Sequence, residues 1–208
     1  HRFGGVGRGD LNLLRQLGLQ YGFEVVTIAP VTLGDQRISS TLIRNLLQEG
    51  DVTRAAALLG RPYSILADVG EGAGLGAELG FPTANLRLPP EKLLPRDGVY
   101  AGVAGRASGD CVVMQQPRPA AINVGTAPTM GRGRRVVEVH LIGAHCDLRH
   151  TRLKVEFLRW LREERQFPDR AALVEQIARD VRECVATAQE AEVWCATGYR
   201  IEREPLDS

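Results

Sequence analysis

A glycine-rich segment followed by a short polar run is the first part of the sequence whose residue types could do chemistry. Five glycines fall between Gly70 and Gly80, and the run Phe81–Asn85 follows directly. Glycines let a backbone approach a phosphate closely, and consecutive amides can form a nest that binds anions. Taken alone, such a segment is more often an ordinary loop.

Thr83 and Asn85 extend this pattern. They lie two residues apart on an expected strand, so their side chains should point to the same face. A hydroxyl and an amide carbonyl are hard oxygen ligands, which suit Mg²⁺ held mainly by phosphates and water. A Thr/Asn turn after Pro82 accounts for the spacing equally well, and the spacing alone leaves both interpretations open.

A second candidate is the carboxylate of Glu138. The run Val136–Leu141 alternates, so Glu138 and His140 share one face, whereas Val137, Val139 and Leu141 share the other. A carboxylate at such a position is either solvated or placed to accept a proton. The pattern by itself favours the solvated face, because one side of an antiparallel sheet commonly meets water.

The segment Ser39–Arg44 reads Ser-Ser-Thr-Leu-Ile-Arg and stands at the expected start of a helix. A helix N-terminus binds anions through its free amides and its dipole, and Arg44 lies about one turn inside, able to reach the same phosphate. A plain serine cap explains this spacing too, and spacing alone favours the cap.

Other reaction classes find no support in the residue spacing. The histidines lack metal-ligand spacing, and the sequence contains neither a Gly-x-Ser-x-Gly nucleophile motif nor a P-loop lysine motif. The cysteines form no Cys-x-x-Cys pair, which argues against a zinc site or a disulfide framework and favours reduced thiols in a cytoplasmic protein. They are Cys111, Cys146, Cys184 and Cys195.

The elements that must position these residues begin with an α/β segment of about sixty residues. Asp10 is expected to cap a short helix that ends at Gly18, and the apolar, β-branched run Phe23–Ala29 is expected to form a buried strand. Two further helices are expected, each with an N-cap residue and a terminal glycine. They run from Ser39 to Gly50 and from Asp51 to Gly60.

From about residue 61 the sequence changes to short β-rich runs separated by Gly and Pro. Runs at this spacing, with no long helix between them, suggest an antiparallel barrel or sandwich. The expected strands are Tyr63–Val69, Thr83–Leu88, Gly98–Ala104, Cys111–Gln115, Ala120–Val124, Val136–Ile142 and Thr151–Leu158.

A long helix is expected to begin at Asp169. Apolar residues recur there every four positions, which predicts one stripe facing a core. The stripe consists of Leu173, Ile177, Val181 and Val185, with Cys184 and Ala188 beside it.

Composition excludes several classes of function. The 208 residues include 26 Lys+Arg and 25 Asp+Glu, a net charge of +1, whereas a general nucleic-acid binder needs a basic surplus. No apolar run reaches the roughly 20 residues of a membrane span. The sequence begins at His1 rather than Met, as expected for a fragment of a longer protein.

The motifs occur in one order along the chain. They are Ile38–Arg44, Leu59–Tyr63, Leu79–Leu86, Asp97–Tyr100, Asn123–Thr129, Val137–Leu141, Val155–Leu158 and Leu161–Phe167. In this order they resemble the bacterial bifunctional riboflavin kinase/FMN adenylyltransferase (FAD synthetase) family. The resemblance extends to about residue 190, and the run Pro-Thr-Ala-Asn in register with the other motifs is its most specific feature.

The resemblance implies a two-domain organisation. Residues 1–60 would be the C-terminal part of a Rossmann-like α/β nucleotidyltransferase domain, residues 61–190 a riboflavin kinase domain, and residues 191–208 a polar tail. The kinase domain would be an all-β six-stranded antiparallel barrel with a C-terminal helix. The family's His-x-Gly-His signature is absent, so the chain is not expected to make FAD.

The resemblance also implies the ligands. ATP and riboflavin or FMN would be the substrates and products, with Mg²⁺ or another divalent cation as cofactor. Neither nucleic acid nor a membrane is an expected partner, and the sequence does not define the oligomeric state.

The resemblance further assigns roles in the kinase site. Gly72 and Gly76 would cover the ATP phosphates, while Thr83 and Asn85 would position the metal and the nucleotide. Glu138 would accept the proton of the riboflavin 5′-hydroxyl as that oxygen attacks the γ-phosphate, which reverses the interpretation of Glu138 as a solvated residue.

Two further groups of residues follow from the same resemblance. One belongs to a segment that would close over the isoalloxazine ring, and the other to the phosphate site of the adenylyltransferase. The first comprises Arg162, Glu164 and Phe167, and the second Ser39, Ser40, Thr41 and Arg44.

The chain departs from the family pattern around the expected ligand-binding loops. Two alternatives to a riboflavin kinase therefore stay open: a flavin- or nucleotide-binding module without catalysis, and a kinase for a flavin analogue. The departures are Asp68, Ala77, Gly143, Arg149, His150 and Gln166.

Overall fold

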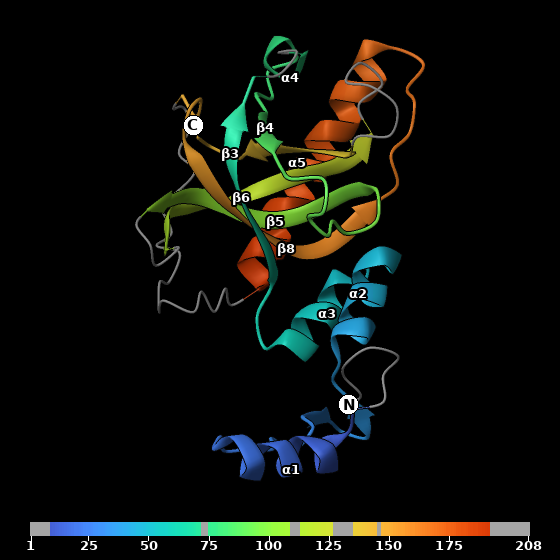
Figure 1. The fold of residues 1–208 in the computed structure, drawn as a ribbon. Helices are drawn as coiled ribbons and strands as arrows, with labels where there is room; N and C mark the ends of the chain where they lie inside the picture. The colour runs from blue at the N-terminus through green and yellow to red at the C-terminus, as the bar shows by residue number, and fades with distance from the viewer. Residues whose placement is uncertain (1–8, 72–74, 109–112, 127–134, 145–146, 192–208) are drawn as a thin grey trace. The chain divides into compact units, whose positions relative to one another are not determined.

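The computed structural model describes residues 9–71, 75–108, 113–126, 135–144 and 147–191 (Figure 1). Contacts within the chain divide it into two compact units, His1–Ile38 and Ser39–Ser208, and each is described by itself. This division concerns packing, so the predicted domain limits at residues 60 and 190 stay predictions.

Over residues 9–38, the part of the first unit that the structure describes, the chain forms one helix and one small sheet. Asp10 caps the helix as predicted, since its Oδ1 accepts a hydrogen bond from the amide of Leu13 (2.9 Å). The predicted end at Gly18 is wrong: the helix continues to Tyr21 and ends at Gly22, whose φ is 74°. Gly18 instead allows close packing, because a Cβ there would lie 2.6 Å from the carbonyl oxygen of Phe23. The elements are α1 (Leu11–Tyr21), β1 (Thr32–Leu33) and β2 (Gln36–Arg37).

The predicted buried strand Phe23–Ala29 is also wrong. The run forms no strand, and Ile28 is 89% exposed. A strand needs a neighbour to pair its backbone groups, and among the described residues the only sheet in this unit is the two-stranded pair β1–β2. The Rossmann-like character of this part therefore stays a prediction from the family resemblance.

The second unit begins with two helices that match their predicted limits. Ser39 Oγ accepts a hydrogen bond from the helix's third residue (3.2 Å), and Asp51 Oδ1 caps the next helix in the same way (3.0 Å). Both helices end at glycines with positive φ, which is the left-handed conformation that glycine adopts without strain. The two helices are α2 (Ser40–Glu49) and α3 (Val52–Leu59).

Six antiparallel strands of this unit form a closed barrel in the order β3-β4-β7-β6-β5-β8 (Figure 1). Pairing of β3 with β8 closes the ring, so of the two predicted architectures the barrel is confirmed. The strands are β3 (Tyr63–Gly70), β4 (Ala84–Arg87), β5 (Gly98–Ser108), β6 (Val113–Thr126), β7 (Arg135–Leu141) and β8 (Arg152–Arg162), and α4 (Leu75–Glu78) lies between β3 and β4.

Alternation along each strand fills the barrel with apolar side chains. On β7 the alternate apolar residues are buried while Glu138 and His140 between them are half-buried, as the pattern predicted. Phe157 on β8 is fully buried and meets the ring of Tyr100 edge-on at 5.3 Å. Such aromatic pairs stabilise a core beyond the area that they bury.

Two predicted strands are parts of one. The runs 111–115 and 120–124 were expected to be separate because Pro117 and Pro119 lie between them, but β6 continues through both prolines. The pairing of β5 with β6 shifts register between Ala104 and Arg106, opposite this region. Proline lacks an amide hydrogen and is tolerated in a sheet at such an irregularity.

The long helix α5 (Arg170–Glu190) begins after the Asp169 cap as predicted and packs against β5 and β6 on the outside of the barrel (Figure 1). The predicted stripe is displaced around the helix. Its four apolar residues are only half-buried, whereas Asp180, Cys184, Thr187 and Ala188 form the buried face. Neither α5 nor any other helix among the described residues is long and apolar enough to cross a membrane.

Replacement of Phe157 by alanine should destabilise the barrel by about 3–5 kcal/mol, because it removes a fully buried ring and leaves a cavity. Denaturant unfolding followed by tryptophan fluorescence measures this change. Arg159→Ala on the same strand, where the side chain is exposed, is the control and should change stability by only about 0.5 kcal/mol. Equal effects of the two substitutions would contradict the proposed packing of the core.

Candidate active site

The strand register brings three polar residues into one row on the outer face of the barrel. Asn85 on β4 pairs with Glu138 on β7, and Glu138 pairs with Asn123 on β6. Directly paired residues of antiparallel strands point to the same face, with Cβ atoms about 4.5–5.5 Å apart. Residues separated by up to 53 positions in the sequence therefore surround one carboxylate.

Glu138 at the centre of this row has a raised pKa. Burial is the main cause, since it disfavours the charged form of the carboxyl, and the negative charge of Glu164 adds to the effect. No group in the described part of the chain donates a hydrogen bond to this carboxylate. A carboxylate with these properties can accept a proton more readily than a solvated one.

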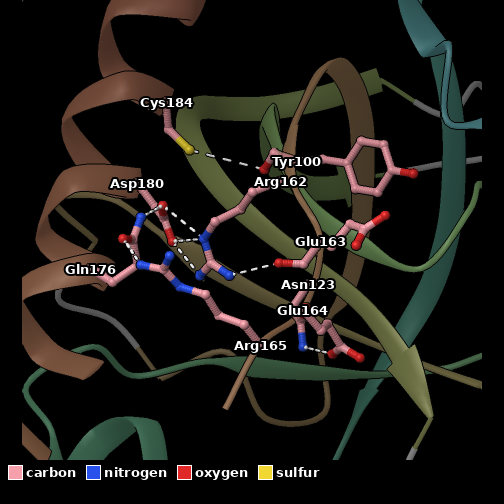
Figure 2. A network of polar contacts seen from close by, with 9 residues as sticks. All are labelled: Tyr100, Asn123, Arg162, Glu163, Glu164, Arg165, Gln176, Asp180 and Cys184. Atoms are coloured by element: carbon pink, nitrogen blue, oxygen red, sulfur yellow. Dashed lines mark hydrogen bonds and ion pairs between the residues drawn. The ribbon is translucent and has the colours of Figure 1, made fainter. Parts of the chain in front are cut away.

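Glu164 is held over the same row by β6. Its Oε1 accepts a hydrogen bond from Nδ2 of Asn123 at 2.9 Å (Figure 2). The carboxylate also lies directly over Gly125, where a Cβ would collide with both of its oxygens. The other polar side-chain atom of Asn123, Oδ1, is buried and has no partner among the described residues.

Thr83 lies beside Asn85 at the start of β4 and is packed against the glycine-rich segment. A Cβ on Gly76 would lie 3.1 Å from Thr83 Oγ1 and 2.5 Å from the carbonyl oxygen of Phe81. Only glycine allows the α4 backbone to approach this closely. Gly72 lies outside the described residues.

Two contacts position this corner of the site. Nδ1 of His140 donates a hydrogen bond to the carbonyl oxygen of Pro82 (2.8 Å), and the His140 ring meets Phe81 edge-on. Arg170, the first residue of α5, donates to the carbonyl oxygen of Glu78 on α4 (2.5 Å). The loop before β4 is therefore tied both to β7 and to the start of α5.

The oxygen atoms of Thr83 and Asn85 fit a magnesium ion. Mg²⁺ takes oxygen ligands, keeps several waters and is often bound through substrate phosphates with few protein groups. At Gly76 backbone rather than a side chain lies next to Thr83, and glycine lets a backbone approach a phosphate closely. The described residues contain no cluster of three His, Cys, Asp or Glu side chains that could hold a metal on its own.

Arg162 and Phe167 stand at the other end of the site. The Arg162 guanidinium is not directed at an open space: it forms an ion pair with Asp180 of α5 (2.6 Å) and lies 5.8 Å from the centre of the Phe167 ring. Phe167 borders a cavity of about 280 Å³ between the segment after β8 and α5. The cavity is lined by Arg165, Gln166, Phe167, Pro168, Ala172, Glu175, Gln176 and Arg179.

The structure adds site residues that sequence reasoning missed. Asn123 was part of a motif but received no role, and its position opposite Glu138 follows only from strand pairing. Asp180 was not singled out from the sequence, although it lies four residues before Cys184 and eight before Ala188 on the helix. That spacing places Asp180 on the buried face of the helix. The spacing is the feature of the sequence that could have identified Asp180.

The Ser39–Arg44 group lies at the start of α2. Ser39 Oγ serves as the helix cap, and the side chains of Ser40, Thr41 and Arg44 are exposed. Both interpretations of this group, cap and phosphate site, are compatible with the arrangement, and the phosphate site stays a prediction.

The departures from the family pattern lie at exposed or turn positions. Asp68 and Arg149 form ion pairs with Arg152 and Asp147, Gly143 has a φ of 72° in a turn, and His150 also has a positive φ. Gln166 lines the cavity beside Phe167, and Ala77 is exposed on α4.

Comparison with known proteins agrees with this geometry. Residues 59–188 match the family model described as flavokinase, or riboflavin kinase. The chain is 37% identical over 180 residues to the bifunctional riboflavin kinase/FMN adenylyltransferase of Escherichia coli strain K12, and 39% identical over 181 residues to that of Pseudomonas fluorescens. These matches cover 86% of this chain but only 55% and 56% of the relatives, so the chain spans little more than half their length.

A solved structure shares the fold. A crystal structure titled as a macrolide-efflux protein from Streptococcus pneumoniae superposes with a TM-score of 0.71 and 27% sequence identity. The match covers 89% of this chain and 57% of that one. The family resemblance inferred from the motifs is confirmed by the family model and by the curated relatives.

The pKa of Glu138 in the ligand-free protein should lie above the ordinary glutamate value, and Glu164→Gln should lower it. Removal of the neighbouring negative charge makes ionisation of Glu138 easier, but burial remains, so the pKa should stay above the ordinary value. NMR titration of the carboxyl carbon measures it. Glu163→Gln, one residue away and paired with Arg96, is the matched control and should leave the pKa of Glu138 unchanged.

Proposed function

Since this chain belongs to the riboflavin kinase family, we propose that it transfers the γ-phosphate of ATP to the 5′-hydroxyl of riboflavin, giving FMN and ADP. The observation that carries the proposal is the row Asn85–Glu138–Asn123, in which a half-buried carboxylate stands between two amide side chains on the barrel surface. Phosphoryl transfer needs positioning, charge neutralisation and a base near the nucleophile. This row offers the base and two amide side chains that can position the reactants, and the magnesium ion would supply the charge neutralisation.

Glu138 acts as the general base in this proposal. As the 5′-oxygen of riboflavin forms its bond to the γ-phosphorus, the bond from that phosphorus to the β,γ-bridging oxygen breaks and ADP leaves. The hydroxyl proton moves to the Glu138 carboxylate. The raised pKa of Glu138 supports this role, because a stronger base accepts the proton more readily.

Thr83 and Asn85 would hold the magnesium ion together with the nucleotide phosphates. The ion would neutralise charge on the transferred phosphoryl group. Gly76 supports this assignment, since its lack of a side chain allows α4 to approach the start of β4 closely. The amides of the glycine-rich segment would add donors to the phosphate oxygens.

The flavin would occupy the side of the site formed by the segment after β8. Phe167 offers an aromatic face beside the 280 Å³ cavity, and a planar ring system such as isoalloxazine packs well against such a face. Glu164 lies between this region and Glu138, where it can meet polar atoms of the flavin.

The curated relatives carry a second activity in their names, FMN adenylyltransferase. We assign residues 1–60 to a Rossmann-like domain of that kind, with Ser39, Ser40, Thr41 and Arg44 at its phosphate site. Small molecules in the cytoplasm are the partners that this function requires.

Incubation of the purified chain with riboflavin, ATP and Mg²⁺ should yield FMN, and omission of the divalent cation should abolish the product. Chromatography separates riboflavin, FMN and FAD in one run, so the same experiment tests the expectation for FAD. Binding of riboflavin without any FMN would favour the non-catalytic flavin-binding module, and faster conversion of another flavin would favour the kinase for a flavin analogue.

Glu138→Ala should lower kcat by about a hundredfold or more, the usual effect of removing a general base. The KM for ATP should change little, because Glu138 is expected to contact the acceptor hydroxyl rather than the nucleotide. Steady-state kinetics measures both parameters. Glu91→Gln, an exposed residue in the β4–β5 connection, is the control, and a wild-type kcat in the Glu138 variant would remove its catalytic role.

A further inference from the structure

We propose that Asp180 on α5 is a positioning residue for the active site, and that it acts through Arg162 to hold the segment 163–167 over the barrel. In this proposal Arg162 is an internal support and not a ligand of the flavin or the nucleotide. The inference rests on the proposed function, because its consequence is measured as riboflavin binding and turnover.

The pair between Asp180 and Arg162 is nearly inaccessible to solvent. The two side chains are 6% and 20% exposed. Nε of Arg162 donates to both carboxylate oxygens at 3.1 Å, and Nη2 donates to Oδ2 at 2.6 Å. Gln176 donates a further hydrogen bond to Oδ1 at 2.7 Å. Hydrogen bonds from both Arg162 and Gln176 therefore hold this buried carboxylate in a defined position.

All three nitrogen atoms of the Arg162 guanidinium donate to protein groups. Nη1 donates to the carbonyl oxygen of Glu163 (2.9 Å), and the other two bond Asp180. The guanidinium also lies against the ring of Phe167, 5.8 Å from its centre. An arginine recognises a phosphate or carboxylate with a planar fork of donors, and here that fork is already occupied by Asp180.

Contacts of Arg162, Arg165 and Glu164 connect α5, through the segment 163–167, to Asn123 of the row Asn85–Glu138–Asn123 (Figure 2). Arg165 bonds Gln176 on α5 and lies 4.9 Å from the centre of the Phe167 ring, so the segment has a second attachment to the same helix. Glu164 lies between these attachments and points to the barrel, where Asn123 donates to it. Helix α5 therefore fixes the chain on both sides of Glu164, the residue whose negative charge adds to the effect of burial on the pKa of Glu138.

These attachments matter because the segment has little else to define its position. Residues 163–169 belong to no helix or strand, and Glu163, Glu164, Arg165 and Gln166 are exposed. Backbone without regular hydrogen bonds and with few buried contacts opens easily. Loss of the buried pair would release the segment while the barrel and the rest of α5 keep their packing.

The test compares two carboxylates of α5 that pair with arginines of β8. Asp180→Asn weakens the buried pair, whereas Glu190→Gln weakens the exposed pair with Arg159 (2.9 Å), which joins the same two elements away from the segment. Asp180→Asn should raise the KM and the Kd for riboflavin by about tenfold, the effect of one lost charged hydrogen bond, with the KM for ATP changed by less than about twofold. Glu190→Gln should leave all three constants within about twofold of the wild type.

A double variant separates positioning from general stability. If Asp180 acts through the segment, Asp180→Asn should have little further effect on riboflavin Kd once Glu164→Gln is present, because residues in one network are not additive. Additive effects, or equal changes in the KM values of both substrates, would overturn the proposal.

Thermal unfolding shows whether the Asp180 variant folds. If it does not, Gln176→Ala takes its place, since this change leaves the ion pair but removes the bonds of Gln176 to Asp180 and Arg165. Gln176→Ala should also raise the Kd for riboflavin, but by a smaller factor than Asp180→Asn. An unchanged Kd would overturn the proposal. If the wild-type chain neither binds riboflavin nor forms FMN, the proposed function itself is refuted. If the wild type is active but the Asp180 variant behaves like the Glu190 control, only this inference is refuted.

Discussion

Hydrogen-bond register around the closed barrel is the constraint on which the candidate site depends. Asn85, Glu138 and Asn123 come from three strands and meet only because β7 pairs with β4 on one side and with β6 on the other. A shift of one residue in β7 would turn Glu138 into the barrel and a valine outward. Val137, Val139 and Leu141 of β7 prevent this shift, since they fill the interior and are at most 7% exposed. The core therefore determines which way the candidate base points.

The outer face of the barrel has two kinds of surface. Where α5 covers β5 and β6, Val103, Met114 and Ala188 form a dry apolar contact. Nearer the start of the helix the same face carries Asp180, and an arginine from the end of β8 neutralises it. A buried charge pair of this kind adds little net stability compared with apolar residues of similar size. In our proposal the pair instead positions the segment that carries Glu164 and Phe167, because Asp180 lies on the helix and Arg162 lies directly before that segment.

Local features of the second unit were predictable because their physical causes are local. The caps at Ser39, Asp51 and Asp169 use side-chain oxygens that bond amides three residues away, so a short stretch of sequence contains the whole interaction. The strands of the barrel were predictable from alternation for the same reason. The prediction of a strand at Phe23–Ala29 was wrong because this run has the composition of a strand but no neighbouring strand among the described residues.

The amino-acid sequence by itself determined the kinds of chemical group available, the caps of α2, α3 and α5, the alternation of faces along the barrel strands and, through its motifs, the family. It thus placed Glu138 on an outward face and Thr83 beside Asn85. Only the tertiary structure decided that Asn123 stands opposite Glu138, that burial and the charge of Glu164 raise the pKa of Glu138, and that Arg162 is occupied by Asp180. Burial and charge interactions depend on residues that the chain brings together from far apart, and no local pattern in the sequence records those distances.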